Sequence, residues 1–268
     1  MHEITLLQGL SLAALVFVLG IDFWLEALFL FRPIIVCTLT GAILGDIQTG
    51  LITGGLTELA FAGLTPAGGV QPPNPIMAGL MTTVIAWSTG VDAKTAIGLG
   101  LPFSLLMQYV ILFFYSAFSL FMTKADKCAK EADTAAIFPR LNWTTMLIVA
   151  SAYAVIAFLC TYLAQGAMQA LVKAMPAWLT HGFEVAGGIL PAVGFGLLLR
   201  VMFKAQYIPY LIAGFLFVCY IQVSNLLPVA VLGAGFAVYE FFNAKSRQQA
   251  QPQPVASKNE EEDYSNGI

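Results

Sequence analysis

The sequence has very little charge. Only 10% of its 268 residues are charged, whereas 59% are hydrophobic. An ordinary soluble domain has roughly 25% charged residues. A soluble chain of this length would still need a charged surface around its core. The shortage therefore predicts that the surface itself is apolar and faces the lipid of a membrane.

Several chemical signals are also missing. The positive charges are scattered, which excludes the clustered basic face of a nucleic-acid-binding protein. No nucleophile-elbow, Walker or dinucleotide-binding motif is present, and neither His2 nor His181 has metal-ligand spacing. We therefore expect no enzyme, no metal and no cofactor. The cysteines lack the spacing of metal or redox sites, so we expect them to be buried core residues. They are Cys37, Cys128, Cys160 and Cys219.

The apolar runs predict an all-α polytopic membrane protein. A span needs about 20 apolar residues, and the runs predict about eight to ten transmembrane or re-entrant segments. We expect residues 1–245 to form the membrane domain. Residues 246–268 are polar and should be disordered, and residues 165–181 should form an interfacial helix or hairpin. The N-terminus lacks a basic region, so we expect no cleavable signal. The runs are 4–20, 34–44, 51–63, 76–88, 96–122, 143–164, 185–203, 208–223 and 226–242.

Lysine and arginine positions predict the orientation in the membrane. Residues 124–140 read as a polar loop with three lysines and Arg140, and cytoplasmic loops are enriched in such residues. Four further crossings return the chain to the same side, where Lys245 and Arg247 follow the last run. We therefore expect both this loop and the C-terminus to be cytoplasmic.

The most informative stretch is residues 54–75, which is rich in glycine, proline and amides. The apolar arms on either side are short for full crossings, as in re-entrant hairpins. Irregular backbone at membrane depth is tolerated where it lines a polar cavity. Glu58, Thr65, Gln71 and Asn74 supply donors and acceptors that suit a neutral sugar, and the absence of basic residues disfavours an anion. The alternative is a loop between two ordinary spanning helices.

Other polar residues leave two interpretations open. Glu58 either contacts a substrate or holds backbone at the hairpin tip. Gln108 lies within an apolar run and either reaches a substrate or joins two helices. Glu184 is either a helix-dipole cap or a ligand-binding residue. Asn225 lies between two runs and is either a turn residue or a substrate contact, and Asp46 should cap the next helix.

A loose repeat links the two halves of the chain. Gly54-Gly55-x-x-Glu58 in the first half has an echo in Glu184-x-x-Gly187-Gly188 in the second. Each pairs a carboxylate with two glycines beside a short apolar segment. Transporters often contain inverted repeats whose interrupted helices lie at matching places. The pattern therefore predicts an inverted repeat with interrupted helices.

An ordered string of motifs resembles a known family. Arg32-Pro33, Gly45-Asp46, Gly54-Gly55 and Glu58 follow one another as in the IIC membrane subunits of mannose–fructose–sorbose phosphotransferase systems. The similarity continues through residues 63–74. It returns at Gln108, at Ala125-Asp126-Lys127 and at Gly182-x-x-x-Ala186-Gly187-Gly188, and it covers nearly the whole chain except the tail. Within the family the sequence is most similar to IIC components of galactosamine and N-acetylgalactosamine systems.

The resemblance implies a sugar permease subunit of the bacterial inner membrane. It implies pairing with a homologous IID subunit and trimers of such pairs. Cytoplasmic IIA and IIB proteins would carry phosphate from phosphoenolpyruvate to the sugar, so the chain itself would be no enzyme. The implied substrate is an amino sugar, galactosamine or N-acetylgalactosamine. Two other functions stay open: an ion-coupled secondary transporter acting alone, and a receptor subunit that transports nothing.

The resemblance also implies where sugar binds. The family's sugar contacts fall on the stretch from Thr65 to Asn74, with Pro66 and Gln71 between them. Mannose-specific members tend to have Asn where this chain has Pro66, and Asp where it has Asn74. These departures imply a different sugar. An amide in place of a carboxylate removes a charge and adds a donor, which could suit an acetamido group.

Overall fold

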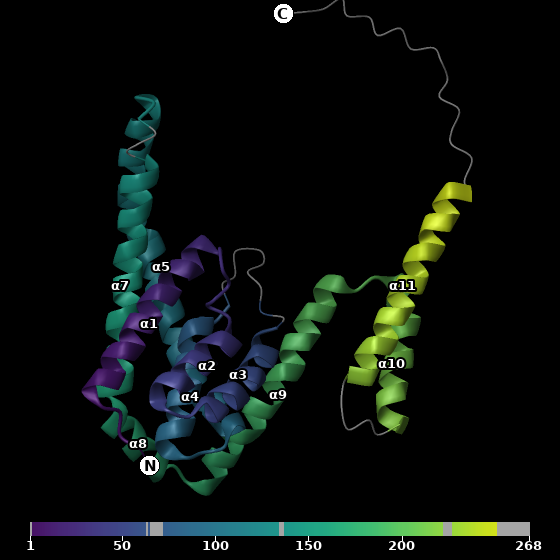
Figure 1. Ribbon diagram of the computed structural model, residues 1–268, viewed down its shortest axis with the longest axis horizontal. Helices are drawn as coiled ribbons and strands as arrows, with labels where there is room; N and C mark the ends of the chain where they lie inside the picture. Colours follow the sequence, from purple (N-terminus) through teal and green to yellow (C-terminus); the bar gives the residue numbers. More distant parts are fainter. Residues whose placement is uncertain (1, 63, 65–71, 134–136, 222–226, 251–268) are drawn as a thin grey trace, which may run out of the picture. The chain divides into compact units, whose positions relative to one another are not determined.

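The computed structural model describes residues 2–62, 64, 72–133, 137–221 and 227–250 (Figure 1). Within these ranges the chain forms ten α-helices and no strand, which confirms the all-α prediction. Four helical stretches are long and apolar enough to cross a bilayer: Leu6–Leu25, Ala93–Lys130, Arg140–Leu163 and Ala177–Arg200. The chain divides into two compact units, residues 1–202 and residues 203–268, which we describe separately.

Helix α1 (Leu6–Leu25) begins with a capping box, in which Thr5 and Gln8 exchange side-chain and backbone hydrogen bonds. At its other end the Asp22 carboxylate accepts from the backbone N–H groups of Leu28 at 2.9 Å and Leu30 at 2.6 Å. These bonds satisfy amides just beyond the helix and hold the turn that follows. The chain is thereby redirected to the start of the next helix.

Helices α2 (Pro33–Leu44), α3 (Ile47–Phe61) and α4 (Pro75–Thr89) are the short segments predicted from the sequence. At 1.5 Å per residue they are about 18, 22 and 22 Å long, less than the roughly 30 Å of a hydrocarbon core. Asp46 caps α3, as predicted: its carboxylate accepts from the Thr49 N–H at 3.0 Å and from the Thr49 hydroxyl at 2.6 Å. These bonds lower the pKa of Asp46 below its ordinary value.

We expected a loop at residues 124–140, but helix α5 (Ala93–Lys130) continues through the first part of this segment. It contains Pro102 and continues through the first basic residues to Lys130. A π-helical turn, η1 (Ile137–Asn142), then leads into α7 (Trp143–Phe158). Alanine and lysine are good helix formers, so a polar composition did not mean irregular backbone here. The described part of this segment is therefore mainly helical.

After α7, unit 1 continues with a π-helical turn, η2 (Leu159–Leu163), and α8 (Gln165–Ala174). Residues 165–174 are therefore helical, in agreement with one of the two forms expected for 165–181. Helix α9 (Ala177–Met202) begins eight residues before the apolar run expected at 185. Polar residues in its first turns hid this start. The Gln165 Oε1 accepts a hydrogen bond from the Ile4 N–H at 2.8 Å, which joins α8 to the N-terminus.

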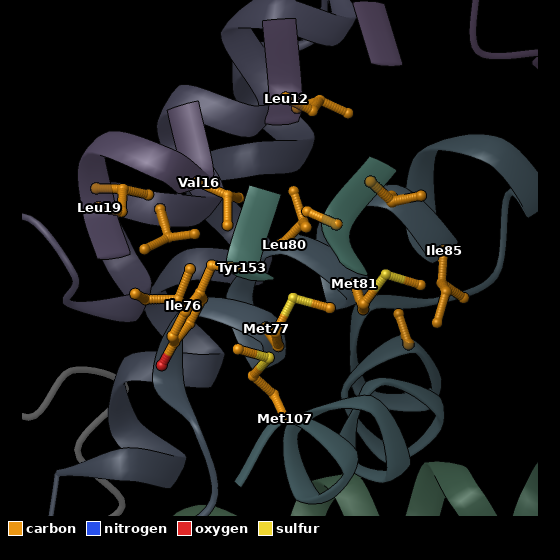
Figure 2. Packing of buried hydrophobic residues seen from close by; sticks show 14 of the residues in the cluster. Leu12, Val16, Leu19, Ile76, Met77, Leu80, Met81, Ile85, Met107 and Tyr153 are labelled. Carbon is orange, nitrogen blue, oxygen red and sulfur yellow. The ribbon is translucent and has the colours of Figure 1, made fainter. Parts of the chain in front are cut away.

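Helix α4 lies at the centre of unit 1 and is almost fully buried. It packs against α2, α3 and α5. Figure 2 shows its side chains gathered with residues of α1, the α7 side chain Tyr153 and the α5 side chain Met107. Burial of this cluster stabilises the unit at roughly 25 cal/mol per Å² of apolar area. The central position of α4 fixes the place where the chain enters it, at Asn74.

Unit 2 contains η3 (Ala205–Tyr207), α10 (Ile208–Ile221) and α11 (Leu227–Ala250). The Tyr210 hydroxyl donates to the Glu240 carboxylate at 3.1 Å between the two helices. Helix α11 continues past residue 245, where we expected the tail to begin, and residues 251–268 lie outside the described ranges.

The cysteines only partly match the expectation of a buried core. All four are free thiols. Cys37 is buried, Cys128 and Cys160 are half-buried, and Cys219 is exposed. The prediction was therefore wrong for Cys219, because in a membrane protein an apolar helix surface can face lipid and need not be interior.

Candidate functional site

The site predicted from the sequence is the tip of the α3–α4 hairpin. Helix α3 ends at Phe61 and α4 begins at Pro75. Thr65, Pro66 and Gln71 lie in the intervening segment, outside the described residues. The residues that frame this segment, Glu58 and Asn74, are both described and define its two ends.

Glu58 is held by two groups from the start of α2. One carboxylate oxygen pairs with the Arg32 guanidinium, and the other accepts from the Ile34 backbone N–H at 3.2 Å. The side chains of Arg32 and Glu58 are 43% and 21% exposed, so the pair is not sealed inside the described structure. Glu58 therefore holds backbone, but that of the first turn of α2 and not that of the hairpin tip, where we expected it. The same exposure leaves the carboxylate accessible to a ligand hydroxyl.

Arg32 is a member of the site that sequence reasoning missed. The argument against an anionic ligand counted only residues 54–75, which contain no basic side chain. Folding brings Arg32 from 26 residues upstream. The Arg-Pro boundary before α2 was the available signal, but nothing in the sequence showed which carboxylate it meets. The tip therefore carries a balanced pair of charges instead of a lone carboxylate.

Asn74 closes the other end of the hairpin segment. Its Oδ1 accepts from the Met77 N–H at 3.0 Å and caps α4, while its Nδ2 donates to the hydroxyl of Tyr153. Its backbone N–H donates to the Ser104 carbonyl of α5 at 3.2 Å. Asn74 is 2% exposed. Sequence reasoning saw a possible ligand contact at this position and missed its role as a cap.

The bond to Ser104 locates Asn74, the residue before α4, along α5. Ser104 lies 11 residues from Ala93, or about 16 Å along the helix. The hydrocarbon core of a bilayer is roughly 30 Å thick. If α5 enters the membrane near Ala93, beside Asp92 and Lys94, Asn74 lies close to mid-membrane. This depth favours the re-entrant interpretation over a loop between full spans.

Gln108 lies one turn after Ser104, so both residues are on the same face of α5. Its side chain is half-buried. This position puts Gln108 on the face of α5 that contacts the hairpin tip.

Glu184 is not brought to the tip in the described structure. The Glu184 carboxylate lies 3.3 Å from His181 Nδ1 on the exposed surface of α9. Helix α9 begins at Ala177, and its first turn contains no acidic residue. The interpretation of Glu184 as a helix cap is therefore wrong. Asn225 lies outside the described residues.

Two glycines of the predicted repeat, Gly54 and Gly187, are places where helices approach closely, whereas Gly55 and Gly188 have open space around them. A Cβ atom on Gly54 would lie 3.1 Å from the backbone of Ile34 in α2. One on Gly187 would lie 2.0 Å from the Lys94 carbonyl oxygen at the start of α5. Both positions therefore need glycine for packing. These contacts explain Gly54 and Gly187, whereas an inverted repeat stays a prediction.

Comparisons with known proteins agree on one family. The family model for the sorbose-specific IIC component of the phosphotransferase system matches residues 6–239. The chain is 99% identical over 268 residues, 100% of both proteins, to N-acetylgalactosamine permease IIC component 1 of Escherichia coli strain K12.

Two solved structures share the fold. One, described as a membrane protein, has a TM-score of 0.79 and 26% identity, and the match covers 89% of this chain and 96% of the other. The second is the mannose transporter ManYZ in complex with microcin E492, with a TM-score of 0.57 and 26% identity over 90% and 96% of the two chains. The relative is named as a permease component, that is, a transport subunit. This multi-pass helical protein therefore belongs to the sorbose-type IIC family of phosphotransferase-system sugar transport subunits.

Proposed function

We propose that the chain carries an amino sugar, N-acetylgalactosamine or galactosamine, across the bacterial inner membrane. The observation that carries this proposal is the full-length 99% identity to a protein named as an N-acetylgalactosamine permease component. The α3–α4 hairpin supports it, because its helices are short for full crossings and Glu58 near the end of α3 is partly exposed.

The proposed sugar site extends from Glu58 across the hairpin segment to α5. Glu58 would accept from sugar hydroxyls, since a carboxylate offers about four acceptor positions and only two are used by Arg32 and Ile34. Thr65, Pro66 and Gln71 complete the proposed recognition segment, and Gln108 would contact the sugar from α5. Glu184 and Asn225 are proposed as contacts from the second half in another conformation of the transport cycle.

Asn74 would act in two ways. Its Oδ1 and one Nδ2 hydrogen are used by the cap and by Tyr153. The amide nitrogen has a second hydrogen, which could reach an acetamido oxygen. Because Asn74 is buried, this contact needs the hairpin segment to move. Asn74 is thus proposed to cap α4 in the present conformation and to bind the sugar after the hairpin segment moves.

Partner proteins complete the proposed transport cycle. ManYZ, the mannose transporter in the structurally similar complex, supports pairing with a homologous IID membrane subunit. We further propose trimers of such pairs and cytoplasmic IIA and IIB proteins that phosphorylate the sugar after translocation. Trapping the sugar as its phosphate would drive accumulation, so no ion gradient is required.

The proposed orientation follows the distribution of lysine and arginine. Residues 124–140 and the C-terminus would be cytoplasmic. Helix α5 then starts at the opposite face, and the α3–α4 hairpin enters the bilayer from that face. Its tip would point toward the cytoplasm, where the phosphorylating partner binds.

Uptake into proteoliposomes tests this function. The chain is reconstituted with its IID partner, and labelled N-acetylgalactosamine is added with or without phosphoenolpyruvate and the IIA and IIB proteins. We expect sugar phosphate to accumulate only with the complete system. Ion-driven accumulation without phosphoenolpyruvate would support the secondary transporter, and no flux under any condition would support the receptor subunit.

A further inference from the structure

Asn74 is held by three different helices at the point where the chain enters α4. Its backbone N–H donates to the Ser104 carbonyl of α5 at 3.2 Å, and its Oδ1 accepts from the Met77 N–H of α4 at 3.0 Å. Its Nδ2 donates to the hydroxyl of Tyr153 in α7. The first two partners are backbone groups. Among the residues that the structure describes, the Tyr153 hydroxyl is therefore the one side-chain group that holds Asn74.

The two bonds to the side-chain amide fix its orientation. The terminal torsion of asparagine has broad energy minima, so the cap bond to Met77 alone would leave the amide plane free to turn about Oδ1. The bond from Nδ2 to Tyr153 removes this freedom, because the plane is then held at both its oxygen and its nitrogen. The amide nitrogen has two hydrogens, and the bond to Tyr153 uses one. The second hydrogen therefore points in one fixed direction.

Tyr153 is well placed to hold this amide because it is itself closely packed. It is fully buried and belongs to the apolar cluster around α4, as Figure 2 shows. A Cβ atom on Gly20 would lie 3.5 Å from the Tyr153 Cβ, so α1 packs directly against α7 at this level. The Phe23 ring of α1 lies 6.4 Å from the Tyr153 ring between centroids. The hydroxyl that meets Asn74 is thus carried by a ring with little freedom to move.

We propose that Tyr153 is a positioning residue that determines sugar specificity through Asn74. The proposal rests on the proposed function, in which the second Nδ2 hydrogen of Asn74 donates to the acetamido oxygen of N-acetylgalactosamine. Tyr153 does not touch the sugar. Its hydroxyl holds the amide so that this hydrogen is aimed before the sugar binds, and such preorganisation raises affinity by lowering the ordering cost of binding. Galactosamine has no acetamido oxygen, so its affinity does not depend on the Tyr153 hydroxyl.

Equilibrium binding of the two sugars tests the proposal. The full-length chain is purified with its IID partner, and dissociation constants for labelled N-acetylgalactosamine and galactosamine are measured. Tyr153→Phe keeps the buried ring and removes only the hydroxyl. A neutral hydrogen bond changes affinity by about two- to twelve-fold, so we expect about five-fold weaker binding of N-acetylgalactosamine and a change of less than about two-fold for galactosamine. The ratio of the two constants gives the preference, and a partial loss of folded protein does not change it.

Two further variants separate the role of Tyr153 from a general effect on packing. Tyr162→Phe is the matched control, because it removes a tyrosine hydroxyl from a ring that packs on Gly9 of α1, away from Asn74. It should leave the preference unchanged. Asn74→Ser keeps a good helix cap but has no amide nitrogen, so it should lower the preference for N-acetylgalactosamine. Adding Tyr153→Phe to Asn74→Ser should lower it no further.

The outcomes distinguish this proposal from the function on which it rests. Equal weakening of both sugars by Tyr153→Phe would show a structural role alone and would overturn the proposal. An unchanged preference in Tyr153→Phe, or a further loss when it is added to Asn74→Ser, would overturn it as well. If the wild-type chain with its partner binds neither sugar, the proposed function itself is wrong, and the role of Tyr153 falls with it.

Discussion

Substitutions at Arg32 and Glu58 can separate a loss of stability from a loss of sugar binding. Glu58→Gln and Arg32→Gln each break the same ion pair. If Glu58 only supports the backbone, the two changes should have the same consequences. If Glu58 also binds sugar hydroxyls, only its own replacement should weaken sugar binding strongly.

The expected magnitudes follow from exposure and hydrogen bonding. Both side chains are partly exposed, so the pair lies between a surface pair and a buried pair. Breaking it should cost about 1–2 kcal/mol of stability in either variant. A hydrogen bond to a charged group contributes about 1.5–3 kcal/mol, so Glu58→Gln should weaken sugar binding about 10- to 150-fold. Arg32→Gln should change it by less than about three-fold, because the carboxylate remains.

The assay combines thermal unfolding in detergent with equilibrium binding of labelled N-acetylgalactosamine. Both variants should lose a similar number of degrees in melting temperature, while their dissociation constants diverge. The double variant, measured in the same way, gives the coupling between the two residues. Equal losses of sugar affinity in the two single variants, after equal losses of stability, would refute a direct role for Glu58 in binding.

Three further predictions concern the caps and the packing of the helices. Asn74→Ala removes the α4 cap and the contact with Tyr153, so it should lower stability by about 1–3 kcal/mol in thermal unfolding; unchanged melting would contradict the buried cap. Gly187→Ala forces a Cβ to within 2.0 Å of a carbonyl oxygen and should cost about 1–3 kcal/mol, whereas Gly188→Ala, with open space around it, should cost nothing. Asp46→Ala should destabilise α3 by about 1 kcal/mol and Asp46→Asn much less. Because its folded pKa is lowered, the contribution of Asp46 charge is present above about pH 4 and is lost as pH falls further, which unfolding measured against pH should show.

The helical fold was predictable because its causes are local. Apolar runs, Pro33 and Pro75 at helix starts, and Asp46 before α3 all act within a few residues. The short lengths of the arms around residues 54–75 were enough to predict an interrupted hairpin. The boundaries failed where polarity was mistaken for irregular backbone, as in the segment that α5 extends to Lys130.

The contacts of the site were not predictable because they join distant parts of the chain. Arg32 meets Glu58 across 26 residues, and Asn74 meets Tyr153 across 79. No spacing rule connects such residues, since helix packing decides which ones meet. The family resemblance supplied the order of the motifs, but the identity of the partners needed the fold.

The most direct test of sugar recognition by the hairpin is a structure of the chain with its IID partner and bound N-acetylgalactosamine. We predict sugar density between Glu58 and Asn74, with a hydroxyl within hydrogen-bond distance of the Glu58 carboxylate. Sugar density elsewhere, with the Arg32–Glu58 pair intact and the residues between Glu58 and Asn74 remote from the ligand, would contradict the proposed site.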